Sequence, residues 1–208
     1  MAKYYVDYDY FNLENTKDLY IISHFKTFQQ SNPSTCAACC ALMVLKHLNI
    51  WKKEFNRADE LKVAEKMHCR PFPLGTDLKD LVNFLKPIAN KNNYTLISSI
   101  EYKKNKDGLC FSTFKRFKKF VIDMLKNSCP IIVENVDYGG HYKVIIGYDC
   151  VNDNYENDML IFADPSDFND NNRDGYSVFP AERFFYMWFD NHCLSEKDRL
   201  QPFITLKK

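Results

Sequence analysis

Three cysteines within five positions stand at the start of a strongly apolar segment, and one of them is placed to act as a nucleophile. The segment is QQSNPSTCAACCALMVL, from Gln29 to Leu45. A cysteine attacks a carbonyl as the thiolate, and a free thiol has a pKa of about 8.5. The unpaired N–H groups at a helix N-terminus lower that pKa. Position therefore favours Cys36, in the first turn, over Cys39 and Cys40, which lie a turn further in where burial keeps a thiol inert.

A thiolate also needs an imidazole that holds it as an ion pair and later protonates a leaving group. His47 lies three turns along the same predicted helix and cannot reach Cys36. His141 opens the apolar run HYKVIIGYD directly after two glycines, which permit close approach of a ligand. The remaining histidines stand outside any apolar pattern: His24, His68 and His192. His141 is the best candidate for the base.

A carboxylate that accepts the second imidazole N–H would orient the ring. Asp164 ends the run MLIFAD and is followed by a proline, which stops strand pairing. If the two runs form an antiparallel hairpin through residues 149–158, His141 and Asp164 share one edge of the sheet. Asp149 then falls at the opposite edge, and Asp167 lies beyond the proline.

The oxyanion formed by attack on a carbonyl needs hydrogen-bond donors. The backbone N–H of Cys36 is one, and an upstream side-chain amide can be the second. The candidates Gln29, Gln30 and Asn32 precede Cys36 by seven, six and four residues, and spacing alone does not choose among them.

The elements expected to hold these residues are mainly helices in the first half of the chain and strands in the second. The helix that starts at Cys36, after Ser34 or Thr35 as cap, is apolar nearly all round and should be central and buried. Helices are predicted at 36–48, 58–67, 75–88 with Thr76 as cap, 114–125 and 181–189, and strands at 94–100, 130–136, 141–149, 159–165, 176–180 and 201–206. This order predicts an α+β domain with a helical layer on a mainly antiparallel sheet.

Composition excludes several other classes of protein. The 208 residues predict one domain, with residues 1–25 as an N-terminal strand or arm. A net charge of +1 argues against a nucleic-acid binder, and the basic run at 115–119 is interleaved with phenylalanines, as on the wet face of an amphipathic helix. No membrane span or signal peptide is visible, which predicts a cytoplasmic protein and leaves non-classical export open. The eight cysteines are expected to be free thiols. Nothing indicates the oligomeric state.

The residues Gln30, Cys36, His141 and Asp164, in this order, resemble those of papain-like cysteine peptidases. The closer resemblance is to the C39-like peptidases, a bacterial family whose best-known members remove leader peptides. The segments that carry it lie between about residues 25 and 190 and are QSNPSTCAACCALMVL, GGHYKVIIGYD, IFADPS and YSVFPAERFFYMWFD. The opening Gln-Ser-x-Pro-x-x-Cys is also similar to the catalytic domain of phytochelatin synthases.

The resemblance implies one papain-like domain whose central helix carries Cys36 as nucleophile, with His141 as base and Asp164 as the group that orients it. It selects Gln30 over Gln29 as the oxyanion donor. The implied reaction is hydrolysis of a peptide or isopeptide bond in a peptide or protein substrate, without cofactor or metal. Transfer of the acyl group to an amine would make the protein a transpeptidase of the phytochelatin-synthase type.

Two features depart from the family pattern. Ala37 stands where the family has glycine after the nucleophile, which limits how closely a substrate backbone can approach. The loop at 167–175 is longer than in the family and is expected at the rim of the substrate site.

Three other interpretations use some of the same residues. The pair Cys36 and Cys39 forms a CxxC, as in thiol-disulfide oxidoreductases, but no apolar strand precedes it. A structural zinc site would need Cys36, Cys39, His68 and Cys69, and the adjacent last two are poorly spaced for tetrahedral chelation. A papain-like binding protein would keep the fold without catalysis. The presence of all four candidate catalytic residues argues against this interpretation.

Overall fold

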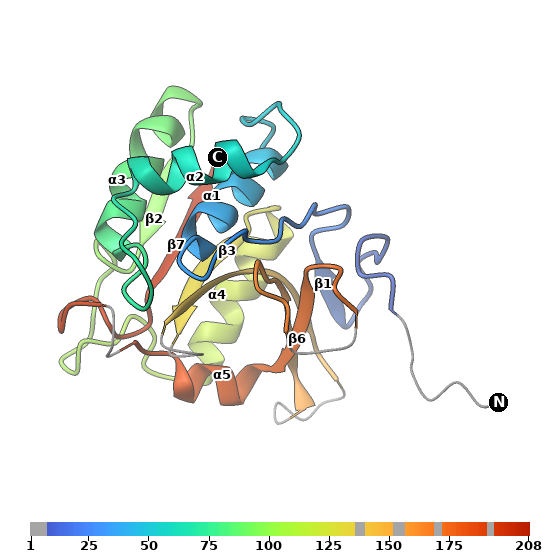
Figure 1. The fold of residues 1–208 in the computed structure, drawn as a ribbon. Helices are drawn as coiled ribbons and strands as arrows, with labels where there is room; N and C mark the ends of the chain where they lie inside the picture. The colour runs from blue at the N-terminus through green and yellow to red at the C-terminus, as the bar shows by residue number, and fades with distance from the viewer. Residues whose placement is uncertain (1–7, 136–139, 152–156, 169–171, 191–193) are drawn as a thin grey trace.

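The computed structural model describes residues 8–135, 140–151, 157–168, 172–190 and 194–208. Helices pack on a sheet of seven strands whose pairs are all antiparallel (Figure 1). This confirms the α+β class predicted from the order of the elements. None of the helices described has the length and apolar character needed to cross a membrane.

The long strand β4 is the centre of the sheet. The strand order is β2-β7-β3-β4-β5-β6, and β1 also pairs with β4, along the half that β3 leaves uncovered. The strands are β1 (Leu19–Ile21), β2 (Thr95–Ser98), β3 (Ile131–Asn135), β4 (His141–Asp149), β5 (Met159–Ala163), β6 (Tyr176–Pro180) and β7 (Phe203–Lys207). The first residue of β4, His141, pairs with Asn135 of β3, which holds its backbone in place.

The hairpin predicted between β4 and β5 is confirmed. Asp149 pairs with Met159 at the end that the loop joins, and Val144 pairs with Ala163 toward the other end. The register shifts between Ile145 and Gly147, where a β-bulge increases the local twist. The residue after β5 therefore lies beside the start of β4.

The first helix is buried along most of its length. Residues 36–45 of α1 are all buried, as its apolar sequence predicted, and the helix packs on β4, α2 and α3. The helices are α1 (Cys36–His47), α2 (Arg57–Lys66), α3 (Leu78–Lys91), α4 (Phe114–Lys126) and α5 (Ala181–Met187). The helix cap predicted at Thr76 is wrong: Asp77 is the N-cap of α3, and its carboxylate accepts the N–H of Lys79.

Helix α4 is amphipathic, and the basic residues of the run at 115–119 are exposed except Lys118, which pairs with the buried Asp158. Phe114 and Phe117 are buried while Lys115 and Lys119 face solvent, as the interleaved sequence predicted. The phenylalanines join an aromatic cluster with α5 and β7, in which ring centroids lie 4.8 to 6.2 Å apart: Phe111, Phe117, Phe120, Phe184, Trp188 and Phe203. Such contacts between aromatic rings stabilise the packing beyond the apolar area that they bury.

The segment that leads into α1 is tied to the entry of β6. The Tyr176 hydroxyl donates to the Phe25 carbonyl at 2.6 Å, and the Thr27 hydroxyl donates to the Asp174 carbonyl at 2.7 Å. Between these bonds Gly175 has φ +84°, and a Cβ there would lie 2.4 Å from the Thr27 Cβ. The close approach of the two segments therefore requires glycine.

We expect Gly175→Ala to lower the free energy of unfolding by roughly 3 kcal/mol, because positive φ and a steric clash both oppose the new methyl group. Gly108→Ala is the matched control, since Gly108 has φ +80° but a Cβ there would lie 3.5 Å from Leu200. The control should lose only about 1 kcal/mol. Urea unfolding of both variants measures the difference, and equal losses would contradict a clash at Gly175.

Candidate active site

Cys36 is the first residue of α1 and is 5% exposed. Thr35 occupies the N-cap position without a side-chain cap bond, because its hydroxyl donates to the Glu60 carboxylate and also lies 3.1 Å from the Asn32 carbonyl oxygen. The first N–H groups of the helix thus stay available. The backbone N–H groups of Ala37 and Tyr142 lie close enough to the sulfur of Cys36 to lower the pKa of the thiol.

His141 and Asp164 meet where the hairpin predicted them. The imidazole Nε2 lies 2.7 Å from the Asp164 Oδ1, with both side chains buried. The same imidazole hydrogen bonds the Cys36 thiol. Because Nε2 is engaged with the carboxylate, Nδ1 is the nitrogen left for sulfur. Three residues from α1, β4 and the end of β5 thus form one continuous chain of polar contacts.

The three groups set one another's charge. Burial alone would raise the pKa of the Cys36 thiol, but the hydrogen bond and charge of His141 outweigh burial and lower the pKa below its ordinary value. Burial would lower the pKa of His141, but Asp164 and Cys36 raise it to about 9. A lowered thiol pKa beside a raised imidazole pKa is the direction of shift that favours a thiolate–imidazolium pair.

Asp164 is held as an anion although it is 1% exposed. Burial would raise its pKa, but His141, Lys143 and the Ser166 N–H hold the pKa well below its usual range. The Ser166 N–H donates to Oδ1 at 2.9 Å, and the Ser177 hydroxyl lies 3.4 Å from Oδ2. The carboxylate therefore accepts bonds on both of its oxygens.

The other two thiols on α1 lie in different surroundings. Burial, and then the charge of Glu60, raises the pKa of Cys39. Cys40 donates to the Tyr142 carbonyl at 3.3 Å, and burial again raises its pKa. Both side chains therefore stay protonated at neutral pH, and the interaction with His141 belongs to Cys36.

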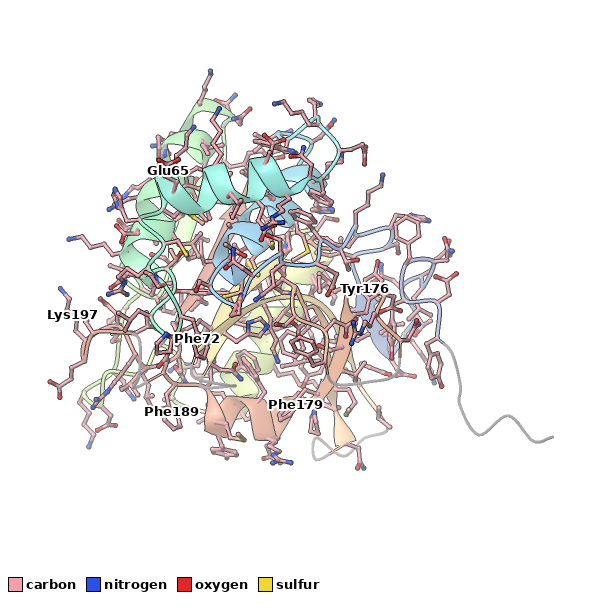
Figure 2. The ribbon with its side chains drawn as sticks, in the orientation of Figure 1. Glu65, Phe72, Tyr176, Phe179, Phe189 and Lys197 are labelled. Carbon is pink, nitrogen blue, oxygen red and sulfur yellow. The ribbon has the colours of Figure 1, made fainter. Side chains whose placement is uncertain are left out.

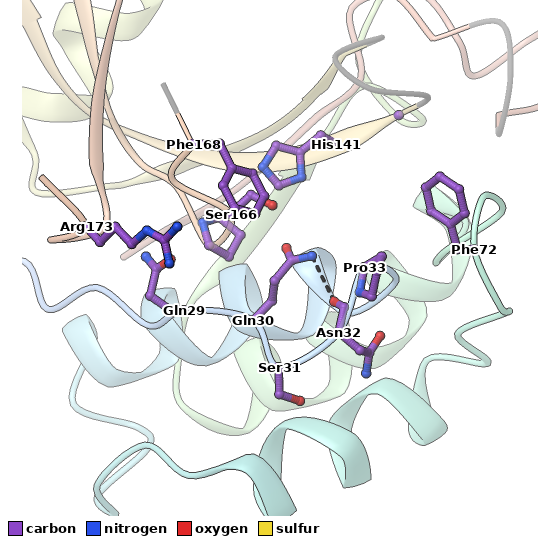
Figure 3. A pocket seen from close by; sticks show the side chains of 12 residues that line it. Gln29, Gln30, Ser31, Asn32, Pro33, Phe72, His141, Ser166, Phe168 and Arg173 are labelled. Atoms are coloured by element: carbon purple, nitrogen blue, oxygen red, sulfur yellow. Dashed lines mark hydrogen bonds between the residues drawn. The ribbon is translucent and has the colours of Figure 1, made fainter. Parts of the chain in front are cut away.

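The three upstream amides have different partners, and that of Asn32 is the Ser34 N–H, which donates to its Oδ1 at 3.0 Å. The Gln29 Nε2 donates to the Asp164 carbonyl at 3.1 Å. The Gln30 Nε2 donates to the Asn32 carbonyl at 2.8 Å, which engages one of its two amide hydrogens (Figure 3). The Gln30 N–H also donates to the Pro165 carbonyl at 2.8 Å. Gln30 is thus fixed beside His141, while the Gln29 amide supports the segment that carries Asp164.

The two other aspartates considered from the sequence lie elsewhere. Asp149 pairs with Met159 at the far end of the hairpin. The buried Asp167 accepts the Gly175 N–H at 2.8 Å, and its own N–H lies 3.3 Å from the Asp164 Oδ1. Asp167 therefore helps to hold the loop around Asp164.

Sequence reasoning missed two buried charged residues at this site. Glu60, on α2, accepts the Ser31 N–H at 2.7 Å and the Thr35 hydroxyl, so it holds the segment before Cys36 from behind. Lys143, on β4, places its Nζ 3.5 Å from the Asp164 Oδ2 and 5.6 Å from the Phe162 ring. A lysine within an otherwise apolar strand was the available signal for the second.

A cleft of about 760 Å³ opens over the imidazole. It is lined by residues 29–33, Phe72, Gly140, His141, Pro165, Ser166, Phe168 and Arg173 (Figure 3). Phe72 lies in the loop between α2 and α3 (Figure 2). It is 64% exposed, and Phe168 is 69% exposed. Phe168 and Arg173 belong to the loop at 167–175 that the sequence placed at the rim; residues 169–171 lie outside the described part of the chain.

Two of the remaining histidines have partners away from this centre. His47 hydrogen bonds the Ser128 carbonyl, and the exposed His68 pairs with Asp80. No group of three or more side chains suited to a metal ion occurs among the described residues. The described cysteines are free, as predicted: Cys36, Cys39, Cys40, Cys69, Cys110, Cys129 and Cys150. His192 and Cys193 lie outside the described residues.

Comparisons with known proteins agree with this fold. The sequence model of the Peptidase_C39 like family matches residues 22–194. Among solved structures, the chain is similar to the peptidase domain of Streptococcus ComA, a bi-functional ABC transporter involved in a quorum sensing pathway. The TM-score is 0.52 at 18% identity, and the match covers 88% of this chain and 98% of that chain. A comparison with curated proteins finds no match.

We expect Lys143→Met to raise the pKa of His141 by about 0.5 to 1 unit, because it removes a cation that competes for Asp164 and repels the imidazolium. Titration of the imidazole nitrogens by NMR measures this shift. Lys115→Met, which removes an exposed charge from α4, is the control and should leave the titration unchanged. A pKa that stays constant or falls in Lys143→Met would contradict the coupling.

Proposed function

Because the chain belongs to the Peptidase_C39 like family, we propose that it is a cysteine peptidase with Cys36 as nucleophile, His141 as general acid and base, and Asp164 as the group that orients the imidazole. The observation that carries the proposal is the buried contact of these three side chains at the edge of a cleft. A structural core has no need of a lowered thiol pKa beside a raised imidazole pKa.

In the first step the Cys36 thiolate attacks the substrate carbonyl and forms a carbon–sulfur bond. The carbonyl π electrons move to oxygen, and the oxyanion accepts hydrogen bonds from the Cys36 N–H and the second amide hydrogen of Gln30. As the tetrahedral intermediate collapses, the C–N bond breaks and His141 gives its proton to the leaving amine. The product is a thioester on Cys36, with a neutral imidazole beside it.

In the second step His141 accepts a proton from water, which attacks the thioester carbonyl. The carbon–sulfur bond breaks, the acid is released, and the thiolate–imidazolium pair is restored. An amine in place of water would give the transpeptidase reaction. Asp164 remains ionised throughout and compensates the charge of the imidazolium.

The cleft supports a peptide or protein as the substrate. Its volume is typical of sites that enclose several residues or a small ligand. Phe72 and Phe168 offer aromatic surface for apolar side chains, and backbone groups of residues 29–33 lie along the floor. Arg173 adds one cation at the rim.

The proposal is tested by alkylation of the thiols with iodoacetamide as a function of pH, with peptide mapping of each cysteine. We expect Cys36 to react first and already below about pH 7, because its pKa is lowered. In His141→Ala the burial of the thiol is no longer offset, so the rate at pH 7 should fall at least about tenfold. Peptidase activity should decline above about pH 9, where His141 loses its proton.

Asp164→Ala is the second arm, and Cys39→Ser is the control that should leave the Cys36 rate unchanged. If Cys36 reacts no faster than an ordinary thiol, or if Cys39 reacts first, the catalytic assignment is wrong. A reactive Cys36 without turnover of any peptide in a mixed-sequence library would favour a papain-like binding protein.

A further inference from the structure

A second cavity, much smaller than the cleft, adjoins the sulfur side of the site. Its volume is about 20 Å³, and Cys36 lines it. Pro33, Phe72 and Gly140 line both the cavity and the cleft, so the cavity adjoins the space proposed for the substrate. A space of this size holds one group as large as a water molecule.

The walls of this cavity carry buried polar side chains. Glu134 is 1% exposed, and Thr76 and Tyr142 are each 3% exposed. Glu134 and Tyr142 are direct neighbours across β3 and β4. The Tyr142 hydroxyl has no hydrogen-bond partner among the described residues. Buried hydroxyls without a partner are rare, which points to a ligand atom that completes the bond.

The charge around the cavity is negative. Burial raises the pKa of Tyr142 well above its ordinary value, and the charges of Glu134, Cys36 and Asp77 raise it further. The phenol therefore stays protonated next to a carboxylate. A cation that enters such a place gains a charge partner, whereas an anion is repelled.

We propose that this cavity binds a primary ammonium group of the substrate, held by Glu134, Tyr142 and Thr76 beside the reacting bond. An ammonium has three N–H donors and is about as large as water. The carboxylate and the two hydroxyl oxygens supply three acceptors, and Glu134 compensates the buried charge. A methylated or acylated amine exceeds the available space. The inference rests on the proposed role of Cys36 and adds to it the class of group recognised next to the bond.

The test uses small thiol reagents, because they report on Cys36 without turnover. A methanethiosulfonate is attacked at its sulfenyl sulfur by the Cys36 thiolate, which forms a disulfide and expels methanesulfinate. The aminoethyl reagent carries a primary ammonium, the methyl reagent is neutral, and the trimethylammonium-ethyl reagent carries the same charge on a group too large for the cavity. Rates at Cys36 come from peptide mapping and are divided by the rates of 2-mercaptoethanol.

We expect the aminoethyl reagent to be favoured over the methyl reagent by about tenfold or more, because charge-assisted hydrogen bonds add to its binding. The trimethylammonium reagent should show no such preference. Glu134→Gln should abolish the preference, and Tyr142→Phe should reduce it. Glu101→Gln, which removes an exposed surface carboxylate, is the control and should retain it.

Each outcome separates the two proposals. Fast modification of Cys36 by all reagents without preference for the ammonium overturns the cavity proposal and leaves the nucleophile intact; the cavity then holds only water. If the aminoethyl and trimethylammonium reagents are favoured equally, the preference reflects the electrostatic potential near Cys36 and not binding in the cavity, and the cavity proposal is also overturned. Slow modification by every reagent overturns the proposed function itself. If Glu134→Gln does not fold, Thr76→Val and Tyr142→Phe carry the test, since both keep the buried charge.

Protection of Cys36 from modification by small amines distinguishes the possible sources of the ammonium group. Glycinamide presents an α-ammonium next to a carbonyl, and n-butylamine presents the end of a lysine side chain. Protection of Cys36 from the methyl reagent by glycinamide alone indicates the amino-terminal residue of a peptide. Protection by n-butylamine alone indicates a lysine. Protection by neither at millimolar concentration contradicts the proposal.

Discussion

The contact between His141 and Asp164 is the interaction on which the rest of the site depends. A thiolate at Cys36 loses its hydration when it is buried, and the imidazolium beside it loses hydration too. The 2.7 Å contact with a carboxylate makes the imidazolium stable in that place. The carboxylate is itself buried, so it needs its own donors from Ser166 and Lys143. The charge on sulfur is thus stabilised by groups two steps removed from it.

This dependence explains which parts of the backbone are most firmly held. His141 begins the central strand of the sheet, and Asp164 follows directly on its hairpin partner, so strand register fixes their distance. The segment before Cys36 has no such ladder. It is held instead by side chains from elsewhere in the chain, namely Glu60 from α2, the turn at Gly175, and Gln29, which bonds the carbonyl of Asp164. The position of this segment, which no strand pairing fixes, is therefore set by buried polar contacts.

The sequence predicted the elements that follow from local pattern. The apolar period located the helices, and the pairing of two apolar runs around a polar loop placed His141 and Asp164 at one edge. The sequence did not predict the N-cap of α3 correctly, because Thr76 and Asp77 are adjacent and both residue types can cap a helix. Which of them does so depends on the direction of each side chain in the fold. Local signals also failed for Glu60 and Lys143, whose partners lie on other elements. Spacing left three amides as oxyanion donors, and only the fold shows that Gln29 has a partner elsewhere.

The two sides of Cys36 differ in charge, and the difference has a consequence for how a substrate binds. His141 and Lys143 supply positive charge on one side, and Glu134 supplies negative charge on the other. The charges of Glu134 and of the Cys36 sulfur both raise the pKa of the Tyr142 hydroxyl. An ammonium bound at Glu134 would place a positive charge close to the thiolate and stabilise it. Binding of such a substrate and formation of the thiolate would then favour each other by the same factor, as linkage requires. An amine-bearing peptide would in this way activate the sulfur that attacks it, while the empty site would hold a less reactive thiol.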